Sequence, residues 1–229
     1  MHLYLGIDFG TTGVRTSVIN EKKEELINYS VSIESPISKG SLVYQNPNLW
    51  WDALLKNFHY LKLKINLENI KRLSIDGTSG TVLITNELGD PIDHALMYND
   101  ASSVKEAEYT EVISSGHPIV SSPTNALVRA LALIKKNSTE SYKILHQADW
   151  IASKIIGEFK FSDENNALKL GYDCQNRMWP TWFEKLPYVC RDPPILKCWG
   201  VGASDTDFDV LGRRRVADTD NNRDIKNRT

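Results

Sequence analysis

A short hairpin near the N-terminus carries the residue types best suited to phosphate chemistry. A carboxylate ends an alternating apolar run, and a turn rich in glycine and threonine follows at once. The chemistry-bearing residues of this hairpin are Asp8, Gly10, Thr11, Thr12, Gly13 and Arg15. Glycines let backbone N–H groups approach an anion closely, and the threonine hydroxyls add two donors. The carboxylate could hold Mg²⁺ or orient a hydroxyl group, and the arginine could balance phosphate charge.

The same residues also suit an ordinary β-hairpin. Glycine is favoured in tight turns whatever their function, and Asp8 could cap nearby backbone N–H groups. The residue types alone therefore leave the phosphate-binding and the structural interpretation open.

Two later segments carry polar side chains beside apolar runs. Asp76 and Ser79 lie at a Gly-Thr-Ser-Gly turn between two strand-like runs, and Asp163 precedes a short helical pattern. Ser79 would serve as a hydroxyl that closes the turn, and Asp163 is placed to be a helix N-cap. Residue type alone therefore gives both side chains a structural role.

The elements that would position these residues follow from hydrophobic periodicity. Strand-like alternation marks the runs 3–7, 14–19, 27–33, 70–76 and 81–85. Helical patterns mark 47–61, 101–114, 125–136 and 147–156. Asn46-Pro47 supplies a capping side chain and a first-turn proline for the first helix, and Gly157 stops the last. Antiparallel strands followed by alternating helices and strands indicate an α/β domain with a mixed sheet.

The composition is that of a globular intracellular protein. Of 229 residues 41% are hydrophobic, and 27 Lys plus Arg against 29 Asp plus Glu give a net charge of −2. This balance argues against nucleic acid or acidic membranes as partners, and no apolar run approaches the roughly 20 residues that cross a bilayer. We expect no secretion signal, because the first residues run straight into a strand-like pattern. The three cysteines lack CxxC spacing, so we expect a reducing cytoplasm rather than disulfides or zinc.

Residues 190–229 differ from the rest of the chain. From residue 204 on, arginine replaces lysine as the main cation, aspartate is frequent and apolar residues are rare. Such a segment cannot bury a core, so we expect a solvated, disordered tail. A basic arm for nucleic acid is the weaker interpretation, because the acidic residues cancel its charge.

Four segments, in this order, resemble the N-terminal domain of the FGGY carbohydrate kinases, a family of the actin-like ATPase superfamily. The hairpin at 5–15 is similar to the family's first phosphate-binding loop, and residues 45–51 resemble its Asn/Asp-Pro-x-x-Trp-Trp helix start. Residues 74–83 resemble the sugar-contacting strand and turn, and residues 161–173 resemble the segment that holds the catalytic aspartate. The last two are most similar to the D-ribulokinase branch, often labelled xylulose kinase-like. The resemblance covers about residues 2–189.

This resemblance implies ATP- and Mg²⁺-dependent phosphorylation of a ketopentose hydroxyl, with D-ribulose to D-ribulose 5-phosphate as the expected reaction. It implies that Asp163 is the general base for the sugar hydroxyl and that Asp8 lies beside Mg²⁺ and the sugar. The other implied contacts are Gly10, Thr11, Thr12 and Arg15 with phosphate, and Asp76 and Ser79 with the sugar.

Two further residues have two interpretations each. Many family members have Trp-x-Asp-x-Arg where this chain has Tyr-Asn-Asp-Ala-Ser at 98–102, so Asp100 is either a sugar contact or an exposed helix N-cap. Trp150 either shapes the pocket or, as we favour, packs in the core.

The family normally continues into a second actin-like domain with the adenosine pocket and a second phosphate loop. Residues 190–229 resemble none of it, so we expect residues 1–189 to be the sugar-binding lobe alone, with little or no turnover. The alternatives are xylulose kinase-like activity, a non-catalytic sugar-binding remnant, or one half of a split kinase. Expected partners are a small sugar and either a separate C-terminal half or a second copy of the chain.

The predicted fold is therefore α/β, an actin-like (ribonuclease H-like) domain with a mixed central sheet. Asp8, Ser79 and Asp163 should converge at one end of that sheet. If any two of these side chains lay on opposite faces of the fold, the catalytic assignment would fail.

Overall fold

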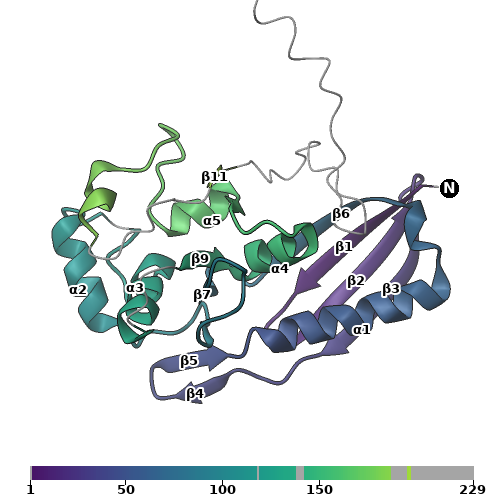
Figure 1. The fold of residues 1–229 in the computed structure, drawn as a ribbon, viewed down its shortest axis with the longest axis horizontal. Coiled ribbons are helices and arrows are strands. Elements are labelled where there is room, and N and C mark those ends of the chain that lie inside the picture. The colour runs from purple at the N-terminus through teal and green to yellow at the C-terminus, as the bar shows by residue number, and fades with distance from the viewer. Residues whose placement is uncertain (1, 118, 138–141, 187–194, 197–229) are drawn as a thin grey trace, which may run out of the picture.

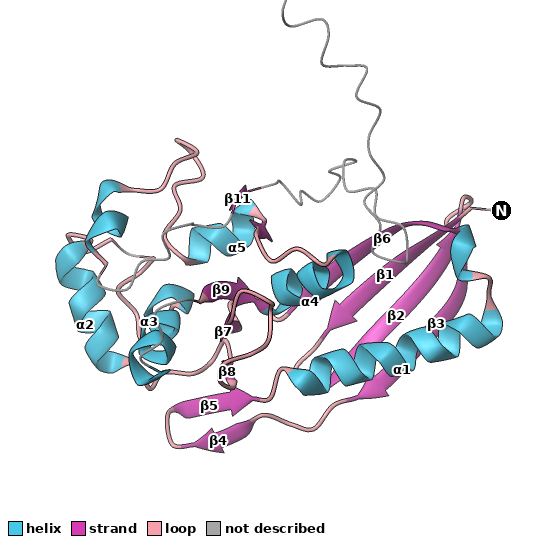
Figure 2. Cartoon of the chain, viewed as in Figure 1, coloured by secondary structure: helices cyan, strands magenta, loops and turns pink. Residues whose placement is uncertain are grey.

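The computed structural model describes residues 2–117, 119–137, 142–186 and 195–196. Apart from residues 195–196, the expected tail at 190–229 lies outside the described residues. Two sheets form the framework, and Figures 1 and 2 show them end to end with helices packed against them.

The first sheet is mixed, as predicted, and has the strand order β3-β2-β1-β6. Its strands are β1 (Leu3–Phe9), β2 (Gly13–Asn20), β3 (Glu25–Ser32) and β6 (Ile70–Gly77). β1 pairs antiparallel with β2 and parallel with β6. The alternation read from the sequence is confirmed in β1, where every second residue from Leu3 is buried while Gly6 and Asp8 are exposed on the opposite face.

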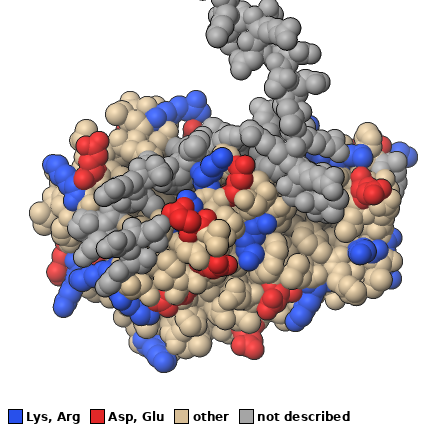
Figure 3. Space-filling view, in the orientation of Figure 1, with Lys and Arg blue, Asp and Glu red and all other residues tan. Residues whose placement is uncertain are grey.

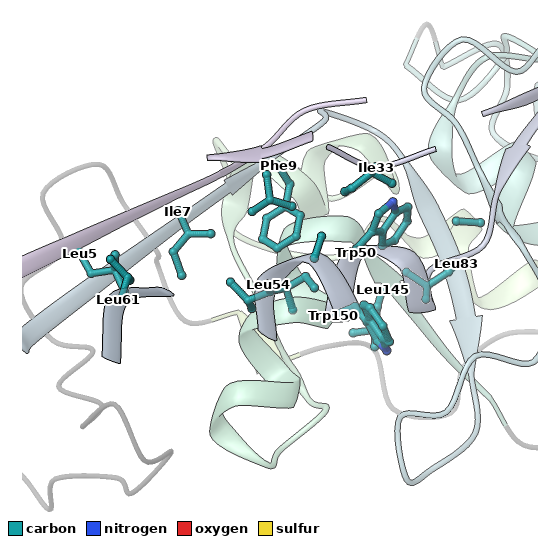
Figure 4. Close-up of a cluster of buried hydrophobic side chains, with 14 of the residues drawn as sticks. Leu5, Ile7, Phe9, Ile33, Trp50, Leu54, Leu61, Leu83, Leu145 and Trp150 are labelled. Atoms are coloured by element: carbon teal, nitrogen blue, oxygen red, sulfur yellow. The ribbon is translucent and has the colours of Figure 1, made fainter. Parts of the chain in front are cut away.

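Two helices cover the buried face of this sheet. Helix α1 (Asn48–Lys64) packs on β2 and β3, and helix α4 (Gln147–Ile156) packs on β6. Figure 4 shows Trp50 and Trp150 among the apolar side chains of this core. Both indoles are fully buried, with ring centroids 6.0 Å apart in a T-shaped contact. The core assignment of Trp150 is therefore confirmed.

The second sheet is antiparallel and has the order β4-β5-β8-β7-β9. Its strands are β4 (Ile37–Lys39), β5 (Leu42–Gln45), β7 (Val82–Thr85), β8 (Ala95–Leu96) and β9 (Lys143–His146). Helix α3 (Ala126–Asn137) packs on β7, and helix α2 (Val104–Ile113) packs on α3. Of these strands the sequence predicted only β7.

The remaining elements are short. They are β10 (Phe161–Ser162), β11 (Ile195–Leu196), α5 (Glu164–Lys169), and two 3₁₀ turns, η1 (Leu67–Asn69) and η2 (Thr181–Lys185). The helix limits read from the sequence hold to within a few residues. Asn46 Oδ1 accepts the backbone N–H of Asn48 at 3.0 Å at the start of α1, and Gly157, with φ of 81°, ends α4.

Charge is dispersed over the surface. On the face shown in Figure 3, basic and acidic side chains are interspersed, and neither sign dominates the described part of that face. Among the described helices, none is both long enough and apolar enough to cross a bilayer.

Candidate functional site

The predicted site lies where β1 and β6 end. In the strand register, Asp8 is opposite Arg15 of β2 on one side and opposite Asp76 of β6 on the other. All three side chains are exposed on the face of the sheet away from α1 and α4. Neighbouring strands are about 5 Å apart, so the two carboxylates repel each other unless a cation lies between or beside them. Asp76 Oδ1 accepts the N–H of Gly77 at 2.8 Å, and the Asp8 carboxylate has no hydrogen bond to another described residue.

These carboxylates fit a magnesium ion better than a protein-only metal cage. No group of three or more His, Cys, Asp or Glu side chains that could hold a metal is present within the described ranges. Mg²⁺ is commonly held by one or two carboxylates together with substrate phosphates and water. The Asp8–Asp76 pair supplies that kind of partial ligand set.

The glycine-threonine hairpin is held in place through its backbone. Gly10 N–H donates to Gly13 O at 2.9 Å, and the O of Thr12 accepts from Ile33 N–H at 2.8 Å. The side chain of buried Gln45 donates to Thr11 O at 3.2 Å. Neither threonine hydroxyl hydrogen-bonds to another residue in the described part of the chain. The backbone is thus fixed while both hydroxyls stay available to a ligand.

The turn between β6 and β7 is tied to the start of α4. Gln147 Oε1 accepts from Thr78 N–H at 2.8 Å and from the Thr78 hydroxyl at 2.7 Å. Gly80 has φ of 86°, a conformation that side-chain-bearing residues rarely adopt. The turn presents Ser79 to solvent at its tip.

Lys169, at the end of α5, joins this turn to the other predicted residues. Its ammonium group donates a hydrogen bond to Ser79 Oγ. Partial burial lowers the pKa of Lys169, while the charges of Asp163, Asp149 and Asp76 act in the opposite direction. The structure therefore brings Ser79, Asp76 and Asp163 around one lysine, at the same end of the sheet as Asp8.

Asp163 is the N-cap of α5, so its structural interpretation is confirmed. Its Oδ1 accepts the N–H of Asn166 at 2.7 Å, and its Oδ2 accepts from Asn166 Nδ2 at 3.2 Å. The same amide donates to Asp149 Oδ1 at 3.0 Å, and the Ser162 hydroxyl donates to Asp149 Oδ2 at 2.7 Å. Burial raises the pKa of Asp149 to about 7, and the charge of Asp163 acts in the same direction.

Buried polar side chains lie next to the candidate site, where β9 leads into α4. Both ring nitrogens of His146 and the Gln147 Nε2 are buried without a hydrogen-bond partner among the described residues. Burial lowers the pKa of His146 to about 3, and the charges of Lys169 and Arg129 lower it further. His146 is therefore neutral in the neutral pH range.

Asp100 has neither of the two positions predicted for it. Its side chain is fully buried, and its carboxylate accepts from Val43 N–H at 2.7 Å and from the Ser102 hydroxyl at 2.9 Å. The N-cap of α2 is Ser103. Asp100 is thus neither an exposed cap nor an accessible sugar contact, because its carboxylate is buried and accepts a hydrogen bond from the backbone of β5.

The sequence interpretation also missed a buried arginine beside the site. Arg129 of α3 donates to the carbonyl oxygens of Gly80 and Thr124, at 2.8 and 2.9 Å, and to that of Met97. Burial lowers its pKa to about 10, and the charge of Asp100 opposes this shift. The family pattern has an arginine two residues after Asp100, which this chain lacks. Arg129, from helix α3, provides a cation near the Asp100 carboxylate.

Lys169, Asn166 and Gln147 also had no predicted role. The Asp163–Asn166 spacing is that of a helix-capping pair, a local signal that could have identified Asn166. No comparable signal exists for Lys169, whose partner Ser79 lies 90 residues away in the sequence.

Comparison with known proteins identifies relatives for this arrangement. Residues 3–182 match the FGGY family of carbohydrate kinases, N-terminal domain. The xylulose kinases of Staphylococcus xylosus and Escherichia coli K12 are 22% and 21% identical to the chain. The alignments cover 85% and 87% of this chain but 42% and 46% of those relatives. The chain therefore spans less than half the length of the relatives it matches.

Solved structures have the same fold. A xyloylose kinase from Brucella ovis superposes with a TM-score of 0.75 at 20% identity, and a Plasmodium falciparum glycerol kinase with ADP superposes with a TM-score of 0.71 at 17% identity. Each covers 86% of this chain, and the chain covers 43% of each. The predicted α/β fold, that of the N-terminal lobe of such kinases, is confirmed.

Proposed function

From the membership of this chain in the FGGY family of carbohydrate kinases, we propose that it binds the acceptor sugar of an ATP- and Mg²⁺-dependent phosphoryl transfer. The acceptor is a ketopentose. The observation that carries this proposal is the gathering of Asp76, Ser79 and Asp163 around Lys169, at the sheet end where Asp8 also lies.

Two ketopentoses are the candidates. The curated relatives cited above are xylulose kinases, which favours D-xylulose. The sequences at 76–83 and 165–172 are most similar to the D-ribulokinase branch, which favours D-ribulose. We place the activity in the cytoplasm, in line with a free thiol at Cys174 among the described residues.

Each residue has a distinct proposed task. Asp8 would accept a hydrogen bond from a sugar hydroxyl and, with Asp76 beside it, would hold Mg²⁺, which neutralises phosphate charge during transfer. The hydroxyls of Thr11 and Thr12 and the backbone at Gly10 would donate to the γ-phosphate, and Arg15 would balance its charge. Asp163 would take the proton of the attacking sugar hydroxyl.

Asp163 can combine this task with its role as a helix cap. Its oxygens accept two hydrogen bonds from Asn166, and a carboxylate has about four acceptor positions. Capping fixes the carboxylate in one orientation, and the remaining positions can accept the hydroxyl proton of a sugar.

Calorimetric titration of the 229-residue chain with D-xylulose, D-ribulose and glycerol tests the proposal. We expect a ketopentose to bind and Asp8→Ala to weaken that binding at least about tenfold, because a sugar hydroxyl loses its acceptor. Asp52→Ala, on the exposed side of α1, is the matched control and should bind as the wild type does. Absence of sugar binding by the wild-type chain would overturn the proposal.

A second titration in the presence of Mg-ATP separates binding from turnover. Formation of ADP and sugar phosphate would identify a complete transferase activity in the chain. Sugar binding without ADP formation would identify an acceptor-binding unit that acts together with other residues of a kinase.

A further inference from the structure

The hydrogen bond between Lys169 and Ser79 leaves the hydroxyl hydrogen of Ser79 available. An ammonium group only donates hydrogen bonds, so Ser79 Oγ is the acceptor in this contact. The hydroxyl hydrogen of Ser79 then stays available for another partner. Ser79 is exposed at the tip of its turn, so it presents a donor toward any ligand bound there.

The surrounding side chains are acceptors. Asp76 and Asp163 lie close enough to Lys169 for their charges to affect it, and Asp8 is beside Asp76 in the strand register. Carboxylates accept hydrogen bonds from sugar hydroxyls, whereas a carbonyl oxygen placed against a carboxylate stays unpaired and is repelled. The carbonyl of a ketose is the one oxygen that cannot donate. It therefore fits Ser79 and none of the carboxylates.

We propose that Lys169 is a positioning residue that holds Ser79 as the hydrogen-bond donor to the keto oxygen of the acceptor sugar. This inference rests on the proposed function and adds the contact at carbon 2: the keto oxygen depends on the Ser79 donor, whereas the C2 hydroxyl of the corresponding pentitol can also donate to a carboxylate.

The fold holds Lys169 in place for this task. Its stem lies over Gly80, where a Cβ atom would be 3.9 Å from Lys169 Cδ. Asp163 and Asn166 cap the start of the helix that ends at Lys169. The length of α5 and the turn at Gly80 thus bring the ammonium group to Ser79.

The test compares ketoses with pentitols by calorimetric titration of the full chain. The affinity for D-xylulose is compared with that for xylitol, and the affinity for D-ribulose with that for ribitol. Each comparison is made in the wild type and in Lys169→Met, Lys169→Arg and Ser79→Ala. We expect Lys169→Met and Ser79→Ala each to weaken ketose binding about tenfold or more and to change pentitol binding much less. Lys169→Arg keeps a cationic donor and should recover part of the loss.

Two controls separate this role from a structural one. Lys105→Met, on the exposed side of α2, should leave all affinities unchanged. The double variant Lys169→Met with Ser79→Ala should lose no more ketose affinity than the weaker-binding single variant, because both changes remove the same donor. Thermal unfolding of every variant identifies any general loss of folding.

The possible outcomes are distinct. Wild-type binding of a ketose that Lys169→Met leaves unchanged would overturn this inference and leave the proposed function standing. Equal losses for ketose and pentitol in Lys169→Met would also overturn it. Absence of any ketose binding by the wild type would overturn the proposed function and this inference together.

Discussion

At the scale of single residues, Asp163 combines a helix cap with a proposed catalytic role, and two substitutions separate them. Asparagine is as good an N-cap as aspartate but cannot act as a base. We expect Asp163→Ala to lower the free energy of unfolding by about 1 kcal/mol and Asp163→Asn to change it much less. Urea unfolding curves measure both values.

The same pair tests the catalytic assignment. Where the wild-type chain forms ADP in the Mg-ATP assay, both variants should lose transfer to the sugar, although only the alanine variant loses the cap. Transfer at the wild-type rate by Asp163→Asn would leave Asp163 as a cap alone.

Asp149 predicts a specific pH dependence of stability. Burial raises its pKa from 3.8 to about 7, so between these values the folded protein keeps a proton that the unfolded chain releases. Its contribution to the free energy of unfolding is therefore fully present below pH 3.8, falls as pH rises, and is lost above about 7. Asp149→Asn removes this titration.

Denaturant unfolding at about pH 5 and about pH 8 measures the effect. The fall in unfolding free energy between the two pH values should be larger in the wild type than in Asp149→Asn. Asp52→Asn, which is exposed, should keep the wild-type difference. Parallel pH dependence in the wild type and Asp149→Asn would mean that Asp149 is already ionised in the folded protein at the lower pH.

At the scale of elements, α1 supports the glycine-threonine hairpin through two buried side chains. Trp50 Nε1 donates to Gln45 Oε1 at 2.7 Å, and Gln45 Nε2 donates to Thr11 O at 3.2 Å. The packing of α1 on the sheet is thereby linked to the backbone of the hairpin.

Substitutions at Trp50 separate packing from this link. Trp50→Ala should lower the free energy of unfolding by about 3–5 kcal/mol, because it removes a fully buried ring. Trp50→Phe keeps most of the packing but leaves Gln45 Oε1 unpaired, which costs about 1–3 kcal/mol. Chemical denaturation measures both. Equal losses in the two variants would show that packing contributes little beyond the hydrogen bond.

At the scale of the whole molecule, the candidate site lies where the two sheets meet. The carboxyl ends of β1 and β6 point from the first sheet toward the second (Figure 1), and the Gly77–Gly80 turn leads directly into β7. A ligand at this junction would contact segments from both sheets and from α5.

Hydrogen–deuterium exchange with and without a ketopentose checks this placement. Exchange should slow at residues 10–13 and 77–81, because bound sugar restricts both turns. The groove between β3 and α1, lined by Tyr29, Leu55 and Tyr60 among others, is far along the sheet order from β6 and should keep its exchange rates. Slowed exchange confined to that groove would place the sugar there instead.

The sequence by itself determined the family and much of the framework. Period-two alternation in β1, β2 and β3 and helical periodicity in α1, α3 and α4 are local patterns, because one face of each element is buried and the other is not. The second sheet was largely missed for the opposite reason. β8 is two residues long and buried throughout, and β4 is three residues long and exposed throughout, so no alternation marks them.

Tertiary structure alone decided how the candidate site residues are arranged. The sequence identified Asp8, Asp76, Ser79 and Asp163 as separate positions, and the register of β1 with β6 and the contacts of Lys169 brought them to one end of the sheet. The burial of Asp100 and Asp149 was also invisible in the sequence, because burial depends on elements that fold over a residue from elsewhere in the chain. Local patterns determine elements, whereas the direction of a hydrogen bond or the pKa of a carboxyl depends on neighbours that only folding brings close.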